Sequence, residues 1–317
     1  MADAVTSGSS NRDDVKGLIT TYIVQALEEY NAMDANALLA QVAFEYRIPL
    51  GQFSFTVPVI NSGVGEAEQL GESGTASFNK LRVKEKSFSV KDWGAAFFLT
   101  KRSIDTAALG GLDYVSASLN TSMIMINRRL ATELMTAVKT GWVNASLADE
   151  DVPPVFAEKV FDNTHDHIVT TGDLDVYWGE VAGSTTFLSR HLLYAADHIN
   201  EHGYQADVAW IGRKIKQKLV KEMTDAGIYE QLKGDAQIKG FVARYSGLEI
   251  RENPWIPDDA FAVMDSTVKP VAFGNQEAPR YEQKAEFNTL MGQIVASFGF
   301  GIRFPLAGVY IIEGASS

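Results

Sequence analysis

Residues 53–93 read FSFTVPVINSGVGEAEQLGESGTASFNKLRVKEKSFSVKDW, and this stretch decides the fold. Its first part alternates apolar and polar residues, which is the period-2 pattern of a β-strand, and Pro58 within it suits an edge strand. An acidic, glycine-rich segment, Glu66–Gly74, follows. Residues 78–93 then return as a second long and mostly polar strand. Two arms of about 15 residues, rising ~3.3 Å per residue, form a ribbon that reaches on the order of 50 Å.

This ribbon carries too few apolar side chains to form a core of its own, and an isolated two-stranded ribbon is only marginally stable in water. It therefore needs a supporting surface, and the remaining sequence offers no obvious partner region. We expect the segment between Leu50 and Thr100 to lie on a neighbouring subunit. An ordinary meander within a β-domain is the alternative.

Two amphipathic helices flank the ribbon. Residues 111–141 predict one long helix of roughly 45 Å, because apolar residues recur there at spacings of 3 and 4, and other elements should pack across it as a spine. Residues 11–42 predict a second helix, interrupted at Asn31–Asn36, which is either a first core helix or an arm that packs on a neighbouring subunit. The apolar stripe of the long helix consists of Leu112, Val115, Leu119, Met123, Ile126, Leu130, Leu134 and Val138.

The remaining elements come in clusters of helices and clusters of strands, so the fold class is α+β. The predicted elements are a helix at 188–203, a strand at 208–211, a basic helix from Arg213 toward Tyr229, a strand-rich region at 241–273, and final strands at 293–304 and 309–312. Gly299-Phe300-Gly301 lies inside an alternating strand, where glycine marks a bulge or a close approach of another backbone.

The composition is that of an ordinary globular protein of 317 residues, with 46% hydrophobic residues and a net charge of −12. The absence of cysteine excludes disulfides, thiolate metal ligands and cysteine nucleophiles. No apolar run approaches the ~20 residues of a membrane span, so we expect no membrane partner. The Ser-rich, acidic N-terminus does not resemble a signal peptide, which predicts synthesis and retention in a cytosol. The negative charge disfavours a dedicated nucleic-acid reader but permits a container for nucleic acid.

The search for catalytic motifs finds no phosphate-binding loop, nucleophile elbow or zinc-protease motif, so we expect no enzymatic activity and no cofactor. His165 and His167 could offer two imidazoles to a metal ion, and a divalent-metal enzyme built on them is the alternative from a different functional class. His198 and His202 stand four apart on a predicted helix, a spacing that can chelate a divalent ion. Because no third ligand is identifiable, we predict no metal site.

A basic run begins the helix at 213, with five positive residues in nine. Phosphate binding is one interpretation, although no aromatic platform accompanies the charges and acidic residues follow at once. A contact with an acidic loop of a neighbouring subunit, such as Glu66–Glu72, is the other, and it would set register and steer association. The candidate residues of this basic face are Arg213, Lys214, Lys218 and Lys221, and Lys216 lies among them.

The order of these features resembles the major capsid proteins of tailed bacteriophages, which share the Hong Kong 97-type fold. The resemblance covers nearly the whole chain, from the first helix through the ribbon and the spine helix to the closing strands. Its local sequences are AEQLGESG at 67–74, LTKRSID at 99–105, GLEIRENPWIP at 247–257 and GFGIRFPLAGV at 299–309. The first of these departs from the family's turn in the position of its glycine.

The resemblance implies a division of the chain and a structural function. It implies an N-terminal arm at 1–48, an extended β-hairpin loop at 49–104, a peripheral domain containing the spine helix, and an axial domain at 188–270. The peripheral domain would comprise residues 105–187 and 271–317. Copies of the chain would form pentamers and hexamers that close into an icosahedral shell around packaged double-stranded DNA. The protein would be made in the host cytoplasm and would reside in the virion capsid.

The resemblance also implies partners and contact residues. Because only some 45 residues precede the ribbon, scaffolding would come from a separate protein. The other expected partners are a portal, decoration proteins and packaged DNA that is bound without sequence specificity. No covalent crosslink is predicted, since no partner asparagine can be assigned to Lys80, Lys84 or Lys86. The expected contact residues at the tip of the loop are Glu66, Glu68, Gln69, Leu70 and Glu72.

Two further alternatives stay open beside the metal enzyme. One is an encapsulin-like bacterial nanocompartment, which resembles the same fold but loads cargo enzymes. The other is a phage tail or adhesin component, which would form tubes or trimers.

Overall fold

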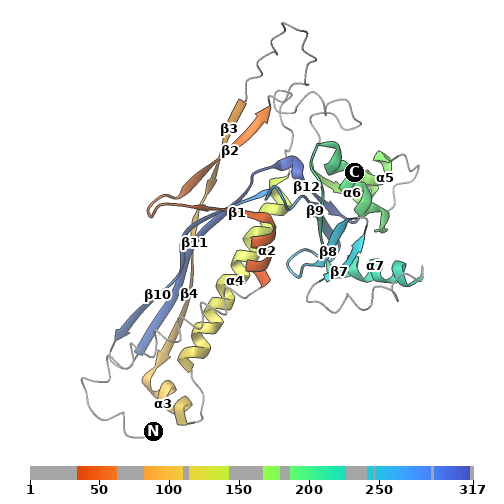
Figure 1. Cartoon of the computed structure of the whole chain (residues 1–317). Helices are drawn as coiled ribbons and strands as arrows, with labels where there is room; N and C mark the ends of the chain where they lie inside the picture. Colours follow the sequence, from red (N-terminus) through yellow and green to blue (C-terminus); the bar gives the residue numbers. More distant parts are fainter. Residues whose placement is uncertain are drawn as a thin grey trace.

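The computed structural model describes residues 34–62, 82–109, 114–142, 167–178, 186–225, 241–245, 247–286 and 289–314. The strands of these residues form three sheets, and the helices gather beside two of them instead of alternating strictly with strands (Figure 1). The predicted α+β class is therefore confirmed.

The first sheet is a long platform with the strand order β1-β10-β11-β4. β10 pairs antiparallel with β11, β11 pairs antiparallel with β4, and the short β1 runs parallel to the start of β10. The bounds of these strands are Ala43–Arg47 for β1, Lys91–Thr100 for β4, Val271–Glu286 for β10 and Thr289–Ile302 for β11.

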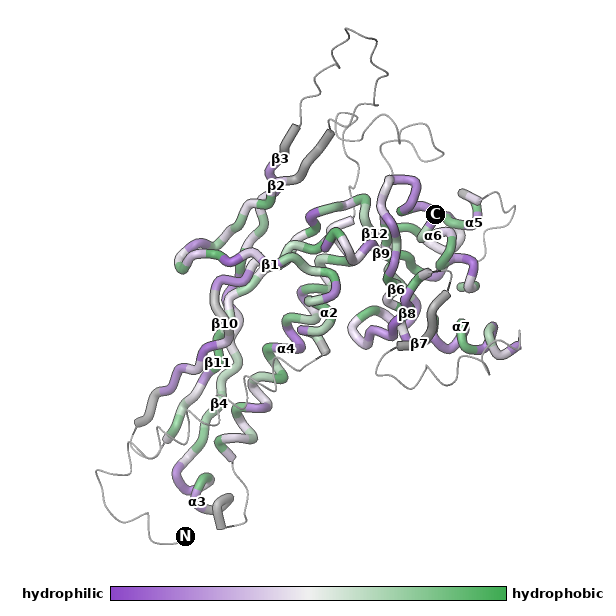
Figure 2. The backbone as a smooth tube through the Cα atoms, viewed as in Figure 1, coloured by the Kyte–Doolittle hydropathy of each residue, from purple (hydrophilic) through white to green (hydrophobic). Residues whose placement is uncertain are grey.

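One helix, α4 (Tyr114–Gly141), runs along this platform and packs on β4 and β11 (Figure 1). Two shorter helices, α2 (Asp34–Val42) and α3 (Lys101–Leu109), contact it. Hydrophobic and hydrophilic positions alternate along α4, as Figure 2 shows, because only one of its faces meets the sheets. The predicted spine helix is confirmed, and its buried stripe includes Leu119, Met123, Ile126, Leu130, Leu134 and Val138.

The second sheet has six strands in the order β5-β12-β9-β6-β8-β7, and three helices accompany it. Its strands are β5 (Ile168–Thr170), β6 (Val208–Ile211), β7 (Phe241–Tyr245), β8 (Leu248–Glu252), β9 (Ala260–Met264) and β12 (Gly308–Ile312). Its helices are α5 (Thr171–Tyr177), α6 (Arg190–Glu201) and α7 (Arg213–Asp225). A short 3-10 helix, η2 (Pro305–Ala307), leads from β11 into β12 and so joins the two sheets through the backbone.

The central strands of the six-stranded sheet are buried on both faces. In β6, Val208 and Trp210 belong to the hydrophobic core that α4 completes, while Ala209 and Ile211 belong to a second core formed with α6 and α7. A strand that is covered on both faces needs apolar residues at every position. This explains why β6 and β9 read as unbroken apolar runs, VAWI and AFAVM.

Three predicted elements differ from the structure. The helix predicted at 11–42 is described only as α2, since residues 1–33 lie outside the described residues. The long strand predicted at 78–93 is two strands, β3 (Arg82–Ser89) and β4, which meet at Val90 and join different sheets. The strand region predicted to end near 273 continues as β10 to Glu286, because beyond β1 this strand lies at the sheet edge and needs few apolar residues.

Candidate subunit interface

The ribbon of the sequence analysis is a two-stranded antiparallel sheet of β2 (Ser54–Ser62) and β3, which extends away from the platform (Figure 1). Opposite residues such as Phe55 and Phe88 face each other across it, with ring centroids 5.6 Å apart. No third strand joins this sheet among the described residues. In the part of the chain that the structure describes, both outer edges of the ribbon thus lack a partner strand, and such edges can pair or pack with another chain.

The base of the ribbon is anchored in its own chain. Phe55 and Val57 are buried in a small core with Ile48, Val90 and Ala272. The expectation that the whole segment between residues 50 and 100 depends on a neighbouring subunit is therefore wrong for this base. It is also wrong for β4, which is an integral strand of the platform. The reason is that the support comes from the same chain: from Ile48, which directly follows β1, and from Ala272 in β10, which lies far away in the sequence.

Glycines in the platform allow the ribbon to approach closely. A β-carbon at Gly299 in β11 would stand 2.1 Å from the backbone oxygen of Ser89, and one at Gly274 in β10 would stand 2.4 Å from the ring of Phe55. A side chain larger than hydrogen therefore requires a backbone shift at Gly299 and a movement of the packed Phe55 and Ile48 side chains at Gly274. The close approach predicted for Gly299 is confirmed, and it fixes where the ribbon leaves the platform.

The predicted contact residues Glu66, Glu68, Gln69, Leu70 and Glu72 come between β2 and β3 in the sequence, and all five lie outside the described residues. Their role as subunit contacts stays a prediction. Below the tip, the loop between β1 and β2 exposes two apolar side chains, Leu50 and Phe53, whose accessible fractions are 74% and 66%. Two large apolar side chains exposed within one short loop make this loop a candidate interaction surface.

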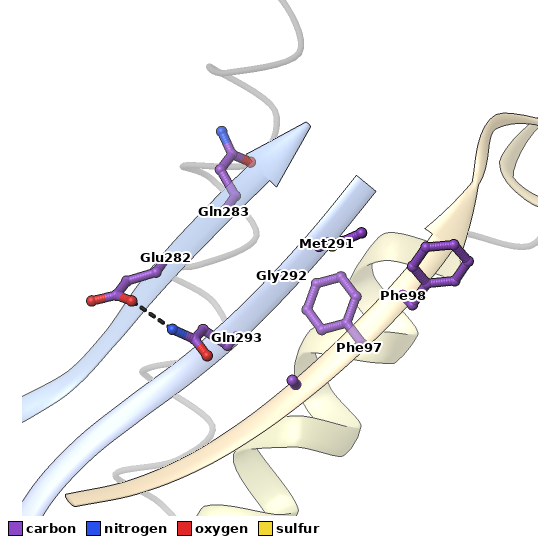
Figure 3. Close-up of a pocket in the computed structure, with 8 residues that line it drawn as sticks. Phe97, Phe98, Glu282, Gln283, Met291, Gly292 and Gln293 are labelled. Carbon is purple, nitrogen blue, oxygen red and sulfur yellow. Dashed lines mark hydrogen bonds between the residues drawn. The ribbon is translucent and has the colours of Figure 1, made fainter. Parts of the chain in front are cut away.

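A second candidate contact surface lies at the far end of the platform. A groove of about 510 Å³ opens there between β4, β10 and β11 (Figure 3). Phe98 and Met291 line it with 57% and 38% of their surface exposed, and the side chain of Gln293 donates a 2.6 Å hydrogen bond to Glu282 at its polar side. Sequence reasoning missed this groove, because it depends on the register that brings Phe98 opposite Met291.

The predicted basic face lies on α7 and is partly neutralised within the chain. Lys218 pairs with Glu313, and Lys216 pairs with Glu252 at 2.5 Å. Arg213, Lys214 and Lys221 are exposed to solvent. The positive charge that this helix offers to a partner therefore comes from these three residues, and the partner itself stays a prediction.

The histidine pairs His165/His167 and His198/His202, which the sequence presents separately, contribute to one cluster. His165 lies outside the described residues, but His167 is buried beside His198 and His202. The conclusion that no third ligand is identifiable for the helical pair is therefore wrong. The third histidine is 31 residues from His198 in the sequence, and only the folded chain, in which the ring of His167 lies against those of His198 and His202, reveals it.

Within the described part of the chain, every helix is too short or too polar to traverse a lipid bilayer. Searches of family models and of curated proteins give no match. Solved structures do match. A structure from Mycobacterium phage Patience is 16% identical, with a TM-score of 0.55 over 95% of this chain and 88% of the other. The capsid of the cyanophage P-SCSP1u is 14% identical, with a TM-score of 0.56 over 86% and 87%.

The chain has the Hong Kong 97-type fold. This confirms, at the level of the fold, the resemblance to phage capsid proteins that the sequence indicates. A virus-like particle from Pyrococcus furiosus matches as well, with 15% identity and a TM-score of 0.51 over 90% of this chain and 96% of the other.

Proposed function

We propose that this chain is the wall subunit of a closed shell. Copies of it assemble into pentamers and hexamers, which close into an icosahedral container for packaged double-stranded DNA. The support is the fold, which this chain shares with the capsid of a cyanophage over 86% of its length. The protein then has a structural role in the wall of a virion capsid and performs no catalytic step.

The observation that carries this proposal is the ribbon. Its base is fixed to the platform by Phe55 and Val57, while β2 and β3 continue beyond the platform and, among the described residues, pair with no further strand. A rigid base and an open outer part suit an element that reaches a neighbouring subunit. Repeated contacts of this kind between different surfaces of identical subunits generate closed rings when the rotation closes.

The sequence-derived contact residues take their roles in this proposal. The loop tip around Glu66, Glu68 and Glu72 would lie on the adjacent subunit, and the exposed cations of α7 would meet acidic segments of another copy. The division into arm, extended loop, peripheral domain and axial domain is part of the same proposal. So are a separate scaffolding protein, a portal, decoration proteins and DNA that is held without sequence recognition.

A second candidate is an encapsulin-like nanocompartment, and one observation favours it. The matching virus-like particle from Pyrococcus furiosus is covered over 96% of its length, so this chain contains nearly every element of that subunit. The two candidates share the assembly step and differ in the contents of the shell. DNA would fill a capsid, whereas cargo protein would fill a nanocompartment.

Electron microscopy of the purified protein tests the proposal. Closed polyhedral particles support a shell, and tubes or trimers contradict it, as do monomers that stay solitary when the scaffolding protein is present. Particles taken from the native source are then treated with nuclease and analysed for protected DNA and for co-purifying protein. Genome-length protected DNA supports the capsid, and an enzyme cargo without DNA supports the nanocompartment.

A further inference from the structure

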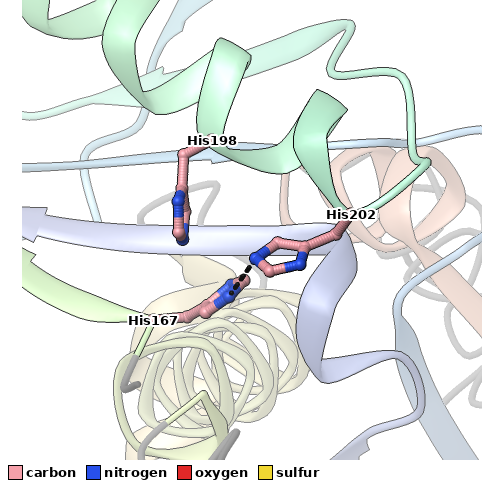
Figure 4. A group of neighbouring side chains, drawn as sticks. All are labelled: His167, His198 and His202. Atoms are coloured by element: carbon pink, nitrogen blue, oxygen red, sulfur yellow. Dashed lines mark hydrogen bonds between the residues drawn. The ribbon is translucent and has the colours of Figure 1, made fainter. Parts of the chain in front are cut away.

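Three histidine side chains meet where α6 lies over the β5–β12 edge of the six-stranded sheet (Figure 4). His167 directly precedes β5, while His198 and His202 lie four residues apart at the C-terminal end of α6. One ring nitrogen of each histidine lies within 4.8 Å of those of the other two. The Nε2 atoms of His167 and His202 are 3.2 Å apart. His167 and His198 are buried and His202 is half-buried.

We propose that these three imidazoles bind one divalent transition-metal ion, and that zinc suits them best. Imidazole nitrogen is a ligand that zinc, nickel, cobalt and copper accept, whereas magnesium and calcium prefer oxygen. Three protein nitrogens leave one position of a tetrahedral zinc ion for another ligand. This proposal concerns a site separate from the subunit contacts, and it holds whether the protein encloses DNA or cargo.

The spacing of the nitrogens supports this assignment. Two nitrogens that each lie 2.0–2.1 Å from a tetrahedral zinc ion are about 3.3 Å from each other. The 3.2 Å separation of His167 and His202 matches this value. His198 completes the set from the preceding turn of α6, and its ring centroid lies 4.7 Å from that of His167 and 4.9 Å from that of His202. Because the ligand nitrogens all lie within 4.8 Å of one another, a small rotation of the His198 side chain would bring its nitrogen to the separation that a tetrahedral zinc ion requires.

The hydrogen bonding of His167 prepares it for a metal. Its Nδ1 lies 2.8 Å from the backbone oxygen of Gly308, an atom that can only accept, so Nδ1 carries the proton. The Nε2 atom is then the unprotonated one, and it faces the other two histidines. A metal-binding histidine that donates its second N–H to a backbone carbonyl is the usual arrangement around zinc, since the bond fixes both the tautomer and the ring plane.

The position of the site gives the metal a mechanical role. The backbone of His167 accepts a hydrogen bond from Tyr310 in β12 and donates one to Trp142 at the end of α4. A metal held by His167, His198 and His202 would therefore tie α6 to the junction of β5, β12 and the spine helix. Metal ligands that come from separate elements stabilise the folded state, because the unfolded chain does not present them together.

The test is a zinc titration of the full-length protein without a polyhistidine tag, after treatment with a chelator and desalting. We expect one zinc ion per chain by isothermal titration calorimetry and a higher melting temperature in the presence of zinc. The His202→Gln and His198→Gln variants should bind zinc about 100-fold more weakly or not at all, since even an outer-shell change costs 10–100-fold. His191→Asn removes another histidine of α6, outside the cluster, and should retain the site.

Each result decides the proposal. X-ray absorption of the zinc-loaded wild-type protein should show about three imidazole ligands, and this measurement does not depend on whether any variant folds. No stoichiometric zinc in the wild-type protein would show that the three histidines are a hydrogen-bonded packing cluster only. Unchanged affinity in a folded His202→Gln variant would overturn the ligand assignment. Equal loss of zinc in a folded His191→Asn variant would do the same.

Discussion

The ring of Phe88 in β3 lies directly against Gly301 in β11, so that a β-carbon on this glycine would stand only 2.1 Å from Cδ1 of the ring. Two positions earlier in β11, Gly299 meets the backbone of Ser89 in the same way. Gly299 and Gly301, on one face of β11, therefore form the surface on which the ribbon packs, and we call this surface the seat of the ribbon. The orientation of the ribbon depends on this seat, because the described part of its body offers only the small core around Val57 as further support.

We expect Gly299→Ala to destabilise the subunit by about 2 kcal/mol or more, at the upper side of the usual cost of overpacking, because a backbone oxygen cannot rotate away as a side chain can. Gly94→Ala is the matched control in β4 of the same sheet, where the nearest atom to a new β-carbon is 3.9 Å away. Urea unfolding of unassembled subunits measures both. Equal stability of the two variants would contradict the conclusion that the ribbon packs closely against Gly299.

The spine helix gives a second prediction. Leu134 is fully buried in the hydrophobic core to which the platform and the six-stranded sheet both contribute, so Leu134→Ala should cost about 2–5 kcal/mol through lost burial and the cavity left behind. Ile124 lies on the outer face of the same helix with 42% of its surface exposed, and Ile124→Ala should cost less than about 1 kcal/mol. Thermal unfolding of the two variants provides the comparison, and a similar loss in both would argue against the assigned faces of α4.

The elements that local pattern determines were predictable from the sequence. The stripe from Leu119 to Val138 has the helical period because a single face of α4 is buried, and the run at 208–211 is apolar throughout because both faces of β6 are covered. The elements that depend on pairing between distant parts of the chain were not predictable from the sequence. The sequence does not mark Val90 as the point where one predicted strand changes sheet, and nothing near His198 in the sequence indicates that His167 lies beside it. The same limit applies to the groove at Phe98.

Acid should destabilise the folded subunit through His191. Burial lowers the pKa of its imidazole below the ordinary 6.5, and the nearby carboxylate of Asp175 opposes this shift only in part. The unfolded chain therefore takes up this proton at a higher pH than the folded chain. The stability that results is present above about pH 6.5 and is lost as the pH falls through the pKa of the folded state. Urea midpoints between pH 7.5 and 5.5 should fall more steeply for the wild-type subunit than for His191→Asn. Parallel pH profiles would exclude His191 as the source.

Removal of the ribbon tip, Glu66–Gly74, should leave a folded subunit that assembles poorly. Among the described residues, the core that anchors the ribbon lies at its base, around Phe55 and Val57. Circular dichroism and urea unfolding check the fold, and electron microscopy with sedimentation checks assembly. Shells of normal yield and shape from this deletion would count against a role of the tip in contacts between subunits.

The groove at the end of the platform should matter for assembly and not for folding. Phe98 and Met291 are exposed there, so replacing both with serine removes little buried area from the single subunit. If a neighbouring subunit covers the groove, the double variant Phe98→Ser with Met291→Ser loses apolar contacts in every copy. A tenfold rise in the critical concentration of assembly, measured by light scattering, corresponds to about 1.4 kcal/mol per subunit and is the expected effect. Val176→Ser, at an equally exposed position on α5, is the control that should assemble like the wild type. Identical critical concentrations for all three proteins would mean that the groove faces solvent in the finished shell.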